Sequence, residues 1–452
     1  MIIAKWYQRA RRPRVHRLLQ ELEASQYWPL ERIRAYQLRK LSALLAHAYA
    51  NVPYYREMFD GVGAVPADIR TLDDLARLPI LTKDIIRARL GNLIATNVAG
   101  ESLIPNSTGG STGRPLQFYQ DAGYKLWADA ARIRGWYNIA GCDLGDTCAV
   151  LWGAVRDVKD DFSPWERARD LMSNGTVNLN AFNLSDERKE TFRRWCERLR
   201  PRLLRGYVSA VKDYARFLEE RHLSFPPLKG IILGAEAVDP EDQRIIERVF
   251  GAPSFNTYGG RELSLMAMEC AHKAGLHEVS ENNYIEFEPI DIDGVENAGN
   301  LIVTNLNNRA MPFLRYRIED VGIPGDAGTC PCGRGLPRIE RVIGRTTEVL
   351  VFHDGTRIAG EMFVHMMRDF PLEAYQFVQT SDRSIRLRVG GGGGIPEGLR
   401  DSIRSAYAKL LPPGVTLEFE EVGEVDGFAR TASGKFRFVF RDPNAREQDV
   451  NA

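Results

Sequence analysis

Short apolar runs that alternate with segments of helical spacing constrain the fold of this chain more than any other feature. Lys229–Gly234 (KGIILG) is typical of a buried strand, and Pro240–Phe250 after it has the pattern of a helix. Arg202–Val208 likewise indicates a strand that leads into a helix at Val211–Glu220, and Thr147–Val155 indicates a third strand. This alternation predicts an α/β fold with a largely parallel sheet.

The flanking regions have different patterns. Apolar residues recur every three or four positions between residues 14 and 58, which predicts helices that end at Pro53, and residues 122–137 also favour a helix. Tyr284–Ile290 and Asn300–Asn305 indicate strands of a β-rich subdomain at about 284–343. We therefore predict a large N-terminal domain at 1–345, with a helical start and mixed sheets flanked by helices. A small α+β domain at 346–452 follows, with a glycine loop at Gly390–Gly394.

Composition excludes several classes of protein. The 452 residues carry equal numbers of basic and acidic side chains, so the chain lacks the net positive charge typical of nucleic-acid binding. No apolar run reaches the ~18 residues of a transmembrane helix, and no secretory signal is visible. Six cysteines in this length do not form a disulfide framework, so we expect a cytoplasmic protein.

A run rich in serine, threonine and glycine at Asn106–Pro115 (NSTGGSTGRP) is the clearest sign of chemistry. Glycine lets backbone N–H groups approach a phosphate, and the hydroxyl groups add uncharged donors. The run lacks the Gly-Lys-Ser/Thr ending of a Walker A loop, since Arg114 and Pro115 stand there. A phosphate loop and a flexible surface turn both fit the run by itself.

Taken with other segments, the run resembles the first core motif of the adenylate-forming superfamily, and most closely the phenylacetate–CoA ligase family with its relatives from capsular-polysaccharide clusters. The remaining motifs follow in the order of that family: Gly234-Ala235-Glu236, Tyr258-Gly259-Gly260-Arg261-Glu262, Arg315–Asp320 (RYRIED), Gly344-Arg345 and Thr431–Lys435 (TASGK). The resemblance covers nearly the whole chain. It implies an enzyme that activates a carboxylic acid as an acyl-adenylate with ATP and passes the acyl group to coenzyme A.

The resemblance also implies a role for each motif residue. Glu262 would hold Mg²⁺, Asp320 would accept hydrogen bonds from the ribose hydroxyls with Arg345 behind it, and Lys435 would be the catalytic lysine on a mobile C-terminal domain. Tyr258 with Gly259 would contact adenine, and Ala235 and Glu236 would line the other side of the base. The phosphates would lie on the loop residues Ser107, Thr108, Gly109, Gly110, Ser111, Thr112 and Gly113.

Three positions depart from the family pattern. Thr347 stands at the position where the family usually has an acidic hinge residue. The resemblance therefore places the hinge at Thr346–Thr347 to within one residue. Asp354-Gly355 replaces the Arg-Gly turn that enters the active site of the family in the second half-reaction, thioester formation. The resemblance therefore supports adenylation more strongly than thioester formation. Arg261 replaces the usual Thr or Ser, and either meets an anion or faces outward.

Cysteine and histidine spacing indicates a metal site. Cys330 and Cys332 lie one residue apart, and Cys270, His272 and His277 lie upstream. Three cysteines and one histidine complete a tetrahedral Zn²⁺ site without an open position, so zinc would be structural. Some family relatives carry the histidine in a Gly-Leu-His stretch, as at Gly275–His277, which favours His277 over His272. Reduced cysteines without a metal are the alternative.

The acid and its acceptor stay open. Coenzyme A is the first acceptor to consider, and an amine or hydroxyl acceptor or a carrier in trans is the second. A nucleotide-binding protein without catalysis is a third reading, and a homodimer is also open. Large aromatic residues near the motifs suit an aryl or compact acid, although any core contains such residues: Trp136, Tyr137, Trp152, Tyr207 and Phe255.

Overall fold

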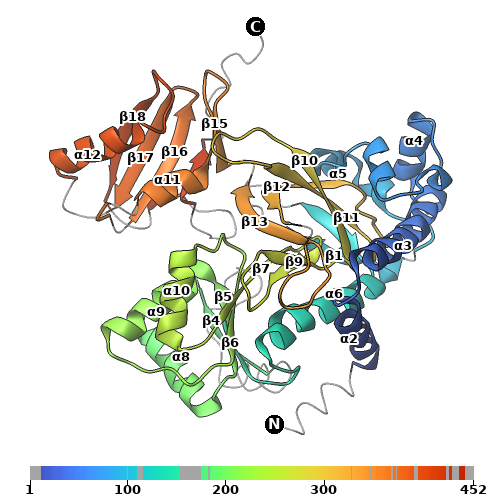
Figure 1. The fold of residues 1–452 in the computed structure, drawn as a ribbon, viewed down its shortest axis with the longest axis horizontal. Helices are drawn as coiled ribbons and strands as arrows, with labels where there is room; N and C mark the ends of the chain where they lie inside the picture. Colours follow the sequence, from blue (N-terminus) through green and yellow to red (C-terminus); the bar gives the residue numbers. More distant parts are fainter. Residues whose placement is uncertain are drawn as a thin grey trace.

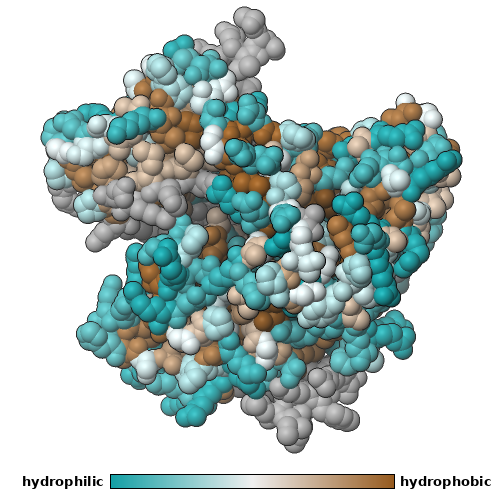
Figure 2. Space-filling model, viewed as in Figure 1, coloured by the Kyte–Doolittle hydropathy of each residue, from teal (hydrophilic) through white to brown (hydrophobic). Residues whose placement is uncertain are grey.

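The computed structural model describes residues 12–98, 100–108, 116–152, 175–181, 184–326, 328–345, 348–367, 370–372, 374–390, 395–423, 427–429 and 437–442. A large body holds the first three quarters of the chain, and a smaller lobe, orange to red in Figure 1, follows it. The outline is indented between this lobe and the part of the body that carries α8, α9 and α10 (Figure 2). The mixed α/β architecture predicted from the sequence is confirmed.

Three helices open the described chain: α2 (Pro13–Ser25), α3 (Leu30–Asn51) and α4 (Pro53–Gly61). The apolar stripe of α3 is buried, including Leu41, Leu44 and Ala48. Pro53 does not end the helical region as expected, because it occupies the first turn of α4, where a missing N–H is tolerated. Helix α5 (Lys83–Arg89) follows after 3₁₀ turns and is capped by Thr82.

A β-hairpin brackets the glycine-rich run, and a long helical segment follows it. The hairpin strands are β1 (Ile104–Ser107) and β2 (Gln117–Gln120), and the helical segment consists of α6 (Ala122–Arg132), the π-helix η5 (Ile133–Tyr137) and the 3₁₀ turn η6 (Asn138–Ala140). Gly135 packs tightly here, since a Cβ atom would lie 2.2 Å from Cδ2 of Leu265, and that side chain would have to move. The segment therefore packs closely against the central sheet.

The central sheet has eleven described strands in the order β10-β11-β12-β13-β9-β8-β7-β6-β5-β3-β4. One half is parallel, and it consists of β3 (Cys148–Trp152), β4 (Thr176–Asn180), β5 (Leu203–Tyr207), β6 (Gly230–Gly234) and β7 (Ser254–Gly260). Helices α8 (Asp186–Leu199), α9 (Val208–Glu220) and α10 (Pro240–Phe250) pack on one face, and η5 and η6 pack on the other (Figure 1).

The other half of the sheet is antiparallel. It consists of β8 (Ser264–Glu269), β9 (Leu276–Glu278), β10 (Asn283–Pro289), β11 (Gly299–Asn305), β12 (Tyr316–Pro324) and β13 (Arg338–Arg345). The strand-rich region thus begins at Ser264, before the predicted start at about 284, because β8 folds back on β7 in a tight hairpin. Among the described residues these strands continue the central sheet and do not form a separate one.

The small lobe has its own sheet, in the order β18-β17-β16-β19. Its elements are β14 (Val349–Val351), β15 (Arg357–Ala359), α11 (Gly360–Met367), β16 (Ala374–Ser381), β17 (Ser384–Gly390), α12 (Glu397–Tyr407), β18 (Thr416–Val422) and β19 (Val439–Arg441). Phe363, Phe377 and Tyr407 form an aromatic core. Of the predicted glycine loop, residues 391–394 lie outside the described chain. No helix in the described ranges has the length and apolar character needed to cross a bilayer.

Candidate functional site

The backbone is strained at several of the sequence motifs. Among non-glycine residues, φ is positive at four positions in or beside the motifs: Ala235 (65°), Ser264 (60°), Arg315 (48°) and Glu319 (70°). Side chains rarely adopt this region, and such strain persists where the surrounding structure enforces it, often at functional sites. Ala235 follows β6, Ser264 begins β8 and Arg315 precedes β12, so three of the four lie at strand ends, while Glu319 lies within β12.

The turn from β7 to β8 positions Glu262. Gly259 is obligatory there, since a Cβ atom would lie 2.4 Å from the main-chain oxygen of Ser264. The Glu262 carboxylate is buried, and its Oε1 atom accepts a hydrogen bond from the Tyr316 hydroxyl at 3.2 Å. The Tyr124 hydroxyl donates to the main-chain oxygen of Glu262 at 3.0 Å. The acidic side chain is therefore held from two sides.

Burial raises the pKa of Glu262 above its ordinary value, while the positive charges of Lys83 and Arg345 and the Tyr316 hydroxyl lower it. Lys83 is itself buried and makes an ion pair with Glu319, with Nζ 2.6 Å from Oε2. A buried carboxylate whose pKa is raised by burial gains from a further positive charge. The buried Glu262 carboxylate is therefore suited to bind a cation.

Asp320 is fixed between Tyr258 and Arg345. The Tyr258 hydroxyl donates to Oδ2 at 2.6 Å, and Nε of Arg345 lies 3.5 Å from Oδ1. Strands β12 and β13 pair Asp320 with Arg345 directly, which brings the two motifs side by side. Burial raises the pKa of Tyr258 and the Asp320 charge raises it further, so the phenol stays protonated and donates. The Asp320 charge likewise raises the pKa of Arg345.

The connection to the small lobe joins this cluster. Gly344 has a φ of 145°, and a Cβ atom there would lie 2.7 Å from Oε2 of Glu348. The main-chain N–H of Arg345 donates to the same Oε2 at 3.1 Å. Glu348, one residue beyond the usual hinge acid, thus occupies the hinge region, and burial raises its pKa. Residues 346 and 347, where the hinge was predicted, lie outside the described chain.

The Ala235-Glu236 segment follows β6 and is tied to helix α9. The Glu236 carboxylate accepts hydrogen bonds from the main-chain N–H of Ser209 at 2.7 Å and from its hydroxyl at 2.9 Å. Glu236 therefore satisfies an N–H group in the first turn of α9, which holds the strained turn at Ala235 in place.

Of the glycine-rich run, the structure describes only Asn106, Ser107 and Thr108. Ser107 ends β1, and the main-chain N–H of Thr108 donates to Leu116 at 3.0 Å while its hydroxyl accepts from the N–H of Leu116 at 2.9 Å. These bonds close the base of the loop. Gly109, Gly110, Ser111, Thr112 and Gly113 lie outside the described residues, as does Lys435.

Cys270, His277, Cys330 and Cys332 come together as a cluster whose ligand atoms all lie within 4.8 Å of one another. The sulfurs of Cys270 and Cys330 are 3.7 Å apart, and Sγ of Cys332 is 3.4 Å from Nε2 of His277. Two thiolates on a tetrahedral zinc ion, with Zn–S of ~2.3 Å, are ~3.8 Å apart, whereas a disulfide needs ~2.05 Å. The cluster takes His277 and leaves His272 out.

The cluster lies against the N-terminal helices. Nε of Arg334 donates to the side chain of Gln26 at 2.8 Å, and the N–H of Gly335 donates to its main-chain oxygen at 3.0 Å. Burial lowers the pKa of His277 to about 4, with a smaller effect from the Arg334 charge. The segment after Cys332 thus joins the turn between α2 and α3 to the central sheet.

Sequence reasoning missed three groups around Glu262. Tyr316 is part of the RYRIED motif, and its hydroxyl could have been assigned only by knowing that β12 faces Glu262. Tyr124 and Lys83 carry no motif signal, because they reach Glu262 from α6 and α5 through tertiary packing.

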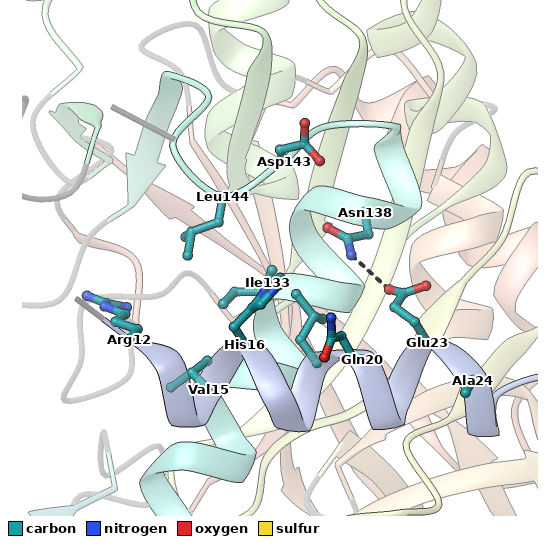
Figure 3. Close-up of a pocket in the computed structure, with 11 residues that line it drawn as sticks. Arg12, Val15, His16, Gln20, Glu23, Ala24, Ile133, Asn138, Asp143 and Leu144 are labelled. Carbon is teal, nitrogen blue, oxygen red and sulfur yellow. Dashed lines mark hydrogen bonds between the residues drawn. The ribbon is translucent and has the colours of Figure 1, made fainter. Parts of the chain in front are cut away.

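A cavity of about 430 Å³ lies elsewhere, between α2 and the η5–η6 segment (Figure 3). Arg12, His16 and Asp143 line it, and the side chain of Asn138 donates to Glu23 at 2.8 Å beside it. No motif residue lines this cavity, so it is distinct from the cluster around Glu262 and Asp320.

Comparisons with known proteins agree with the motifs. No family model matches the chain. Over 347 residues it is 26% identical to the phenylacetate-coenzyme A ligase of Thermus thermophilus, covering 72% of each chain. Over 383 residues it is 27% identical to Protein CapK of Staphylococcus aureus, covering 82% of this chain and 81% of the other.

The fold matches a solved structure of 2-hydroxyisobutyryl-CoA ligase in complex with R3-HIB-AMP. The TM-score is 0.71 at 19% identity, over 93% of this chain and 91% of the other. The predicted resemblance is confirmed: in sequence the chain is related to the phenylacetate-coenzyme A ligases and to Protein CapK, and in fold to an acid–CoA ligase of the adenylate-forming kind.

Proposed function

We propose that the protein activates a carboxylic acid with ATP to an acyl-adenylate and transfers the acyl group to coenzyme A. The observation that carries this proposal is the Asp320 carboxylate, held by Tyr258 and Arg345 in a buried cluster that also contains Glu262. Its remaining lone pairs suit a pair of vicinal hydroxyls, as in a ribose. Similarity to phenylacetate-coenzyme A ligases supports the same reaction.

In the first half-reaction an oxygen of the acid attacks the α-phosphorus of ATP, and pyrophosphate leaves. Both reactants are anionic, so the site must supply positive charge and orientation. Glu262 fits a Mg²⁺ site, because a buried carboxylate offers the hard oxygen ligands that this cation prefers. Bound Mg²⁺ would neutralise phosphate charge. Tyr316 orients the Glu262 carboxylate, and Arg345 would hold Asp320 in place beside the ribose.

The glycine-rich run would cradle the outer phosphates, and Lys435 would bring a charge to the reacting oxygens from the small lobe. Both assignments rest on the resemblance. The hydrogen bonds between Thr108 and Leu116 support the first, because they hold the two flanks of the run together.

The turn after β14 supports an alternative acceptor of the acyl group. Asp354 accepts from the N–H of Thr356 at 3.0 Å, and Nε2 of His353 lies 3.0 Å from the main-chain oxygen of Pro413. An acidic group in this turn would repel the phosphates of coenzyme A if the turn approached them. Transfer to an amine or hydroxyl acceptor is therefore the alternative second half-reaction, and a carrier in trans fits it equally.

The decisive experiment is acid-dependent exchange of pyrophosphate into ATP over a panel of aryl, short-chain and amino acids. We expect exchange with one acid class, and we expect Lys435→Ala to lower it at least ~100-fold, as for groups that stabilise charge in the transition state. Lys409→Ala is the matched control, since Lys409 is an exposed lysine of the same lobe. Absence of exchange with every acid would favour nucleotide binding without catalysis.

The product of the second half-reaction then separates the acceptors. Thioester formed with coenzyme A supports the leading proposal. Hydroxamate formed with hydroxylamine, without any thioester when coenzyme A is present, supports an amine or hydroxyl acceptor instead.

We also propose that Cys270, His277, Cys330 and Cys332 hold a structural zinc ion. The donor set and the sulfur separation of 3.7 Å fit a tetrahedral site, and four protein ligands leave no position for a substrate. Metal analysis of the purified protein should give close to one zinc per chain. Cys330→Ser should remove it, whereas Cys196→Ser, at a buried cysteine of α8, should not. Near-zero zinc in the wild-type protein would exclude the site.

A cytoplasmic location remains a prediction. It is supported by the six cysteines, all of them described, none of which forms a disulfide. A homodimer also remains a prediction without a structural argument.

A further inference from the structure

Arg205 is a charged residue in the middle of a buried parallel strand. It lies on β5 between β3 and β6, paired with Val150 on one side and Ile232 on the other. Its side chain shares the face of the sheet whose core consists of Cys148, Val150, Leu203, Ile232 and Phe255. Central strands of parallel sheets are normally apolar on both faces, so an arginine here calls for a physical reason.

Aromatic rings surround the guanidinium group. Its central carbon lies 4.1 Å from the ring centroid of Trp136 and 5.7 Å from that of Trp152. Trp152 in turn packs on Tyr207, with ring centroids 4.3 Å apart. The π-helix η5 brings Trp136 to this place, and π-helical turns often occur at functional sites. Arg205 thus lies in an aromatic cage formed by Trp136 and Trp152, and Tyr207 packs against Trp152.

The cage provides no anion for the guanidinium. Nε of Arg205 is buried and has no hydrogen-bond partner, and among the described residues no carboxylate pairs with the group. Cation–π contacts return only ~0.5–2 kcal/mol, so a half-buried guanidinium with a buried, unpaired Nε gains further from an anion. By contrast, Arg134, a buried arginine of η5, is paired with Glu281 at 2.8 Å. Arg205 is therefore prepared for an anion from outside the described part of the chain.

The cage is close to the edge of the sheet where the motifs meet. Tyr207 is the last residue of β5 and pairs with Gly234, which directly precedes the motif residues Ala235 and Glu236. Arg205 is two residues back on the same face, ~7 Å from that edge. In open α/β sheets ligands bind at the carboxyl ends of the strands. An acid whose reacting end lies at this edge would direct its far end toward Arg205.

We infer that Arg205 determines the substrate class: the acid that the protein activates carries a second carboxylate at its far end, which Arg205 binds. This inference rests on the proposed acid activation and names its substrate class. A guanidinium group is suited to the role because its planar fork pairs with both oxygens of a carboxylate. The flat rings of Trp136 and Trp152 would contact the apolar middle of the acid.

The test compares acids of equal length that end in a carboxylate or in a methyl group: adipate with hexanoate, and 4-carboxyphenylacetate with 4-methylphenylacetate. In pyrophosphate exchange, we expect kcat/KM of the wild-type protein to favour the diacid of at least one pair by ~10- to 100-fold, as for a charge-assisted hydrogen-bond pair. Arg205→Met should abolish this preference, and Arg205→Lys should restore only part of it.

Arg132→Met is the matched control. The Arg132 guanidinium also lies over Trp136, at 5.7 Å, but is paired with Asp129. This variant should keep the preference for the diacid. If the wild-type protein favours the methyl-ended acids, or if Arg205→Met leaves the ratio unchanged, the inference is wrong while acid activation stands.

Binding without catalysis separates the inference from the proposed function. Because two tryptophans flank Arg205, the diacid should change the intrinsic fluorescence of the wild-type protein but not that of Arg205→Met. Binding of this kind without exchange would support the cage and refute acid activation, and no binding together with no exchange would refute both. The melting temperature of Arg205→Met should equal or exceed that of the wild type, since an unpaired charge is removed. A large decrease would instead assign Arg205 a structural role.

Discussion

Tyr316→Phe tests whether the Glu262 carboxylate must be ionised for the reaction. The substitution removes the hydroxyl that donates to Oε1 of Glu262 at 3.2 Å and leaves the buried ring in place. Since that hydroxyl stabilises the charged carboxylate, its loss raises the pKa of Glu262 further above a value that burial has already raised. The protonated form, which cannot bind a cation, becomes more populated.

The size of the effect follows from the hydrogen bond. A hydrogen bond to a charged group contributes ~1.5–3 kcal/mol, and the separation of 3.2 Å places this one near the lower end. A loss of ~1.5 kcal/mol lowers the ionised fraction about tenfold at any pH below the pKa. Well above the pKa both proteins are fully ionised, so their activities converge. The acid limb of the pH profile therefore moves to higher pH.

The assay is kcat/KM for pyrophosphate exchange as a function of pH, at saturating Mg²⁺. Tyr124→Phe is the control, because its hydroxyl is equally buried but donates to the main-chain oxygen of Glu262, not to the carboxylate. That variant should lose stability by ~1 kcal/mol without a shift of the acid limb. A pH-independent decrease in Tyr316→Phe, or an equal shift in both variants, would refute the reasoning.

Three further predictions concern stability and binding. Arg134→Met leaves the buried Glu281 carboxylate unpaired and should lower the free energy of unfolding by ~3–5 kcal/mol in urea titrations; the double variant with Glu281→Leu should recover most of it, and a loss below ~1 kcal/mol would contradict the pairing. Asp320→Asn should raise the dissociation constant of AMP ~10- to 100-fold in calorimetry, since the charged acceptor is lost, and unchanged affinity would remove Asp320 from the nucleotide site. Cys330→Ser should lower the melting temperature and make it insensitive to a strong chelator that destabilises the wild-type protein; an equal chelator effect in both proteins would argue against the zinc site.

Local signals made several elements predictable to the residue. The helix predicted at Pro240–Phe250 has those bounds in the structure, because Asp239 caps its start, Pro240 occupies its first turn and Gly251, with φ of 61°, ends it. The strand at Gly230–Gly234 was recognisable because both faces of a central parallel strand are apolar. Such features depend on neighbours in the chain and are therefore visible in the sequence.

The motif residues were also predictable, but only as a set that the family resemblance ordered. Their contacts were not: Tyr258 was assigned to adenine, and the structure adds that its hydroxyl is bonded to Asp320, 62 residues away. Glu348 was left as an unassigned neighbour of the hinge, yet it accepts the N–H of Arg345. A hydrogen bond of this kind depends on the register of strands, which the order of residues does not reveal.

The sequence by itself determined the α/β class, several helices, three of the five strands of the parallel half and the list of candidate ligands for nucleotide and metal. Those properties follow from periodicity, from turn chemistry and from which side chains are present. Only the tertiary structure decided that Tyr316 and Lys83 act on Glu262 and that His277 and not His272 joins the three cysteines. It likewise decided that Arg205 has aromatic neighbours but no carboxylate partner within the described ranges. The physical reason is that burial and charge pairing are sums over residues distant in sequence, and folding alone brings those residues together.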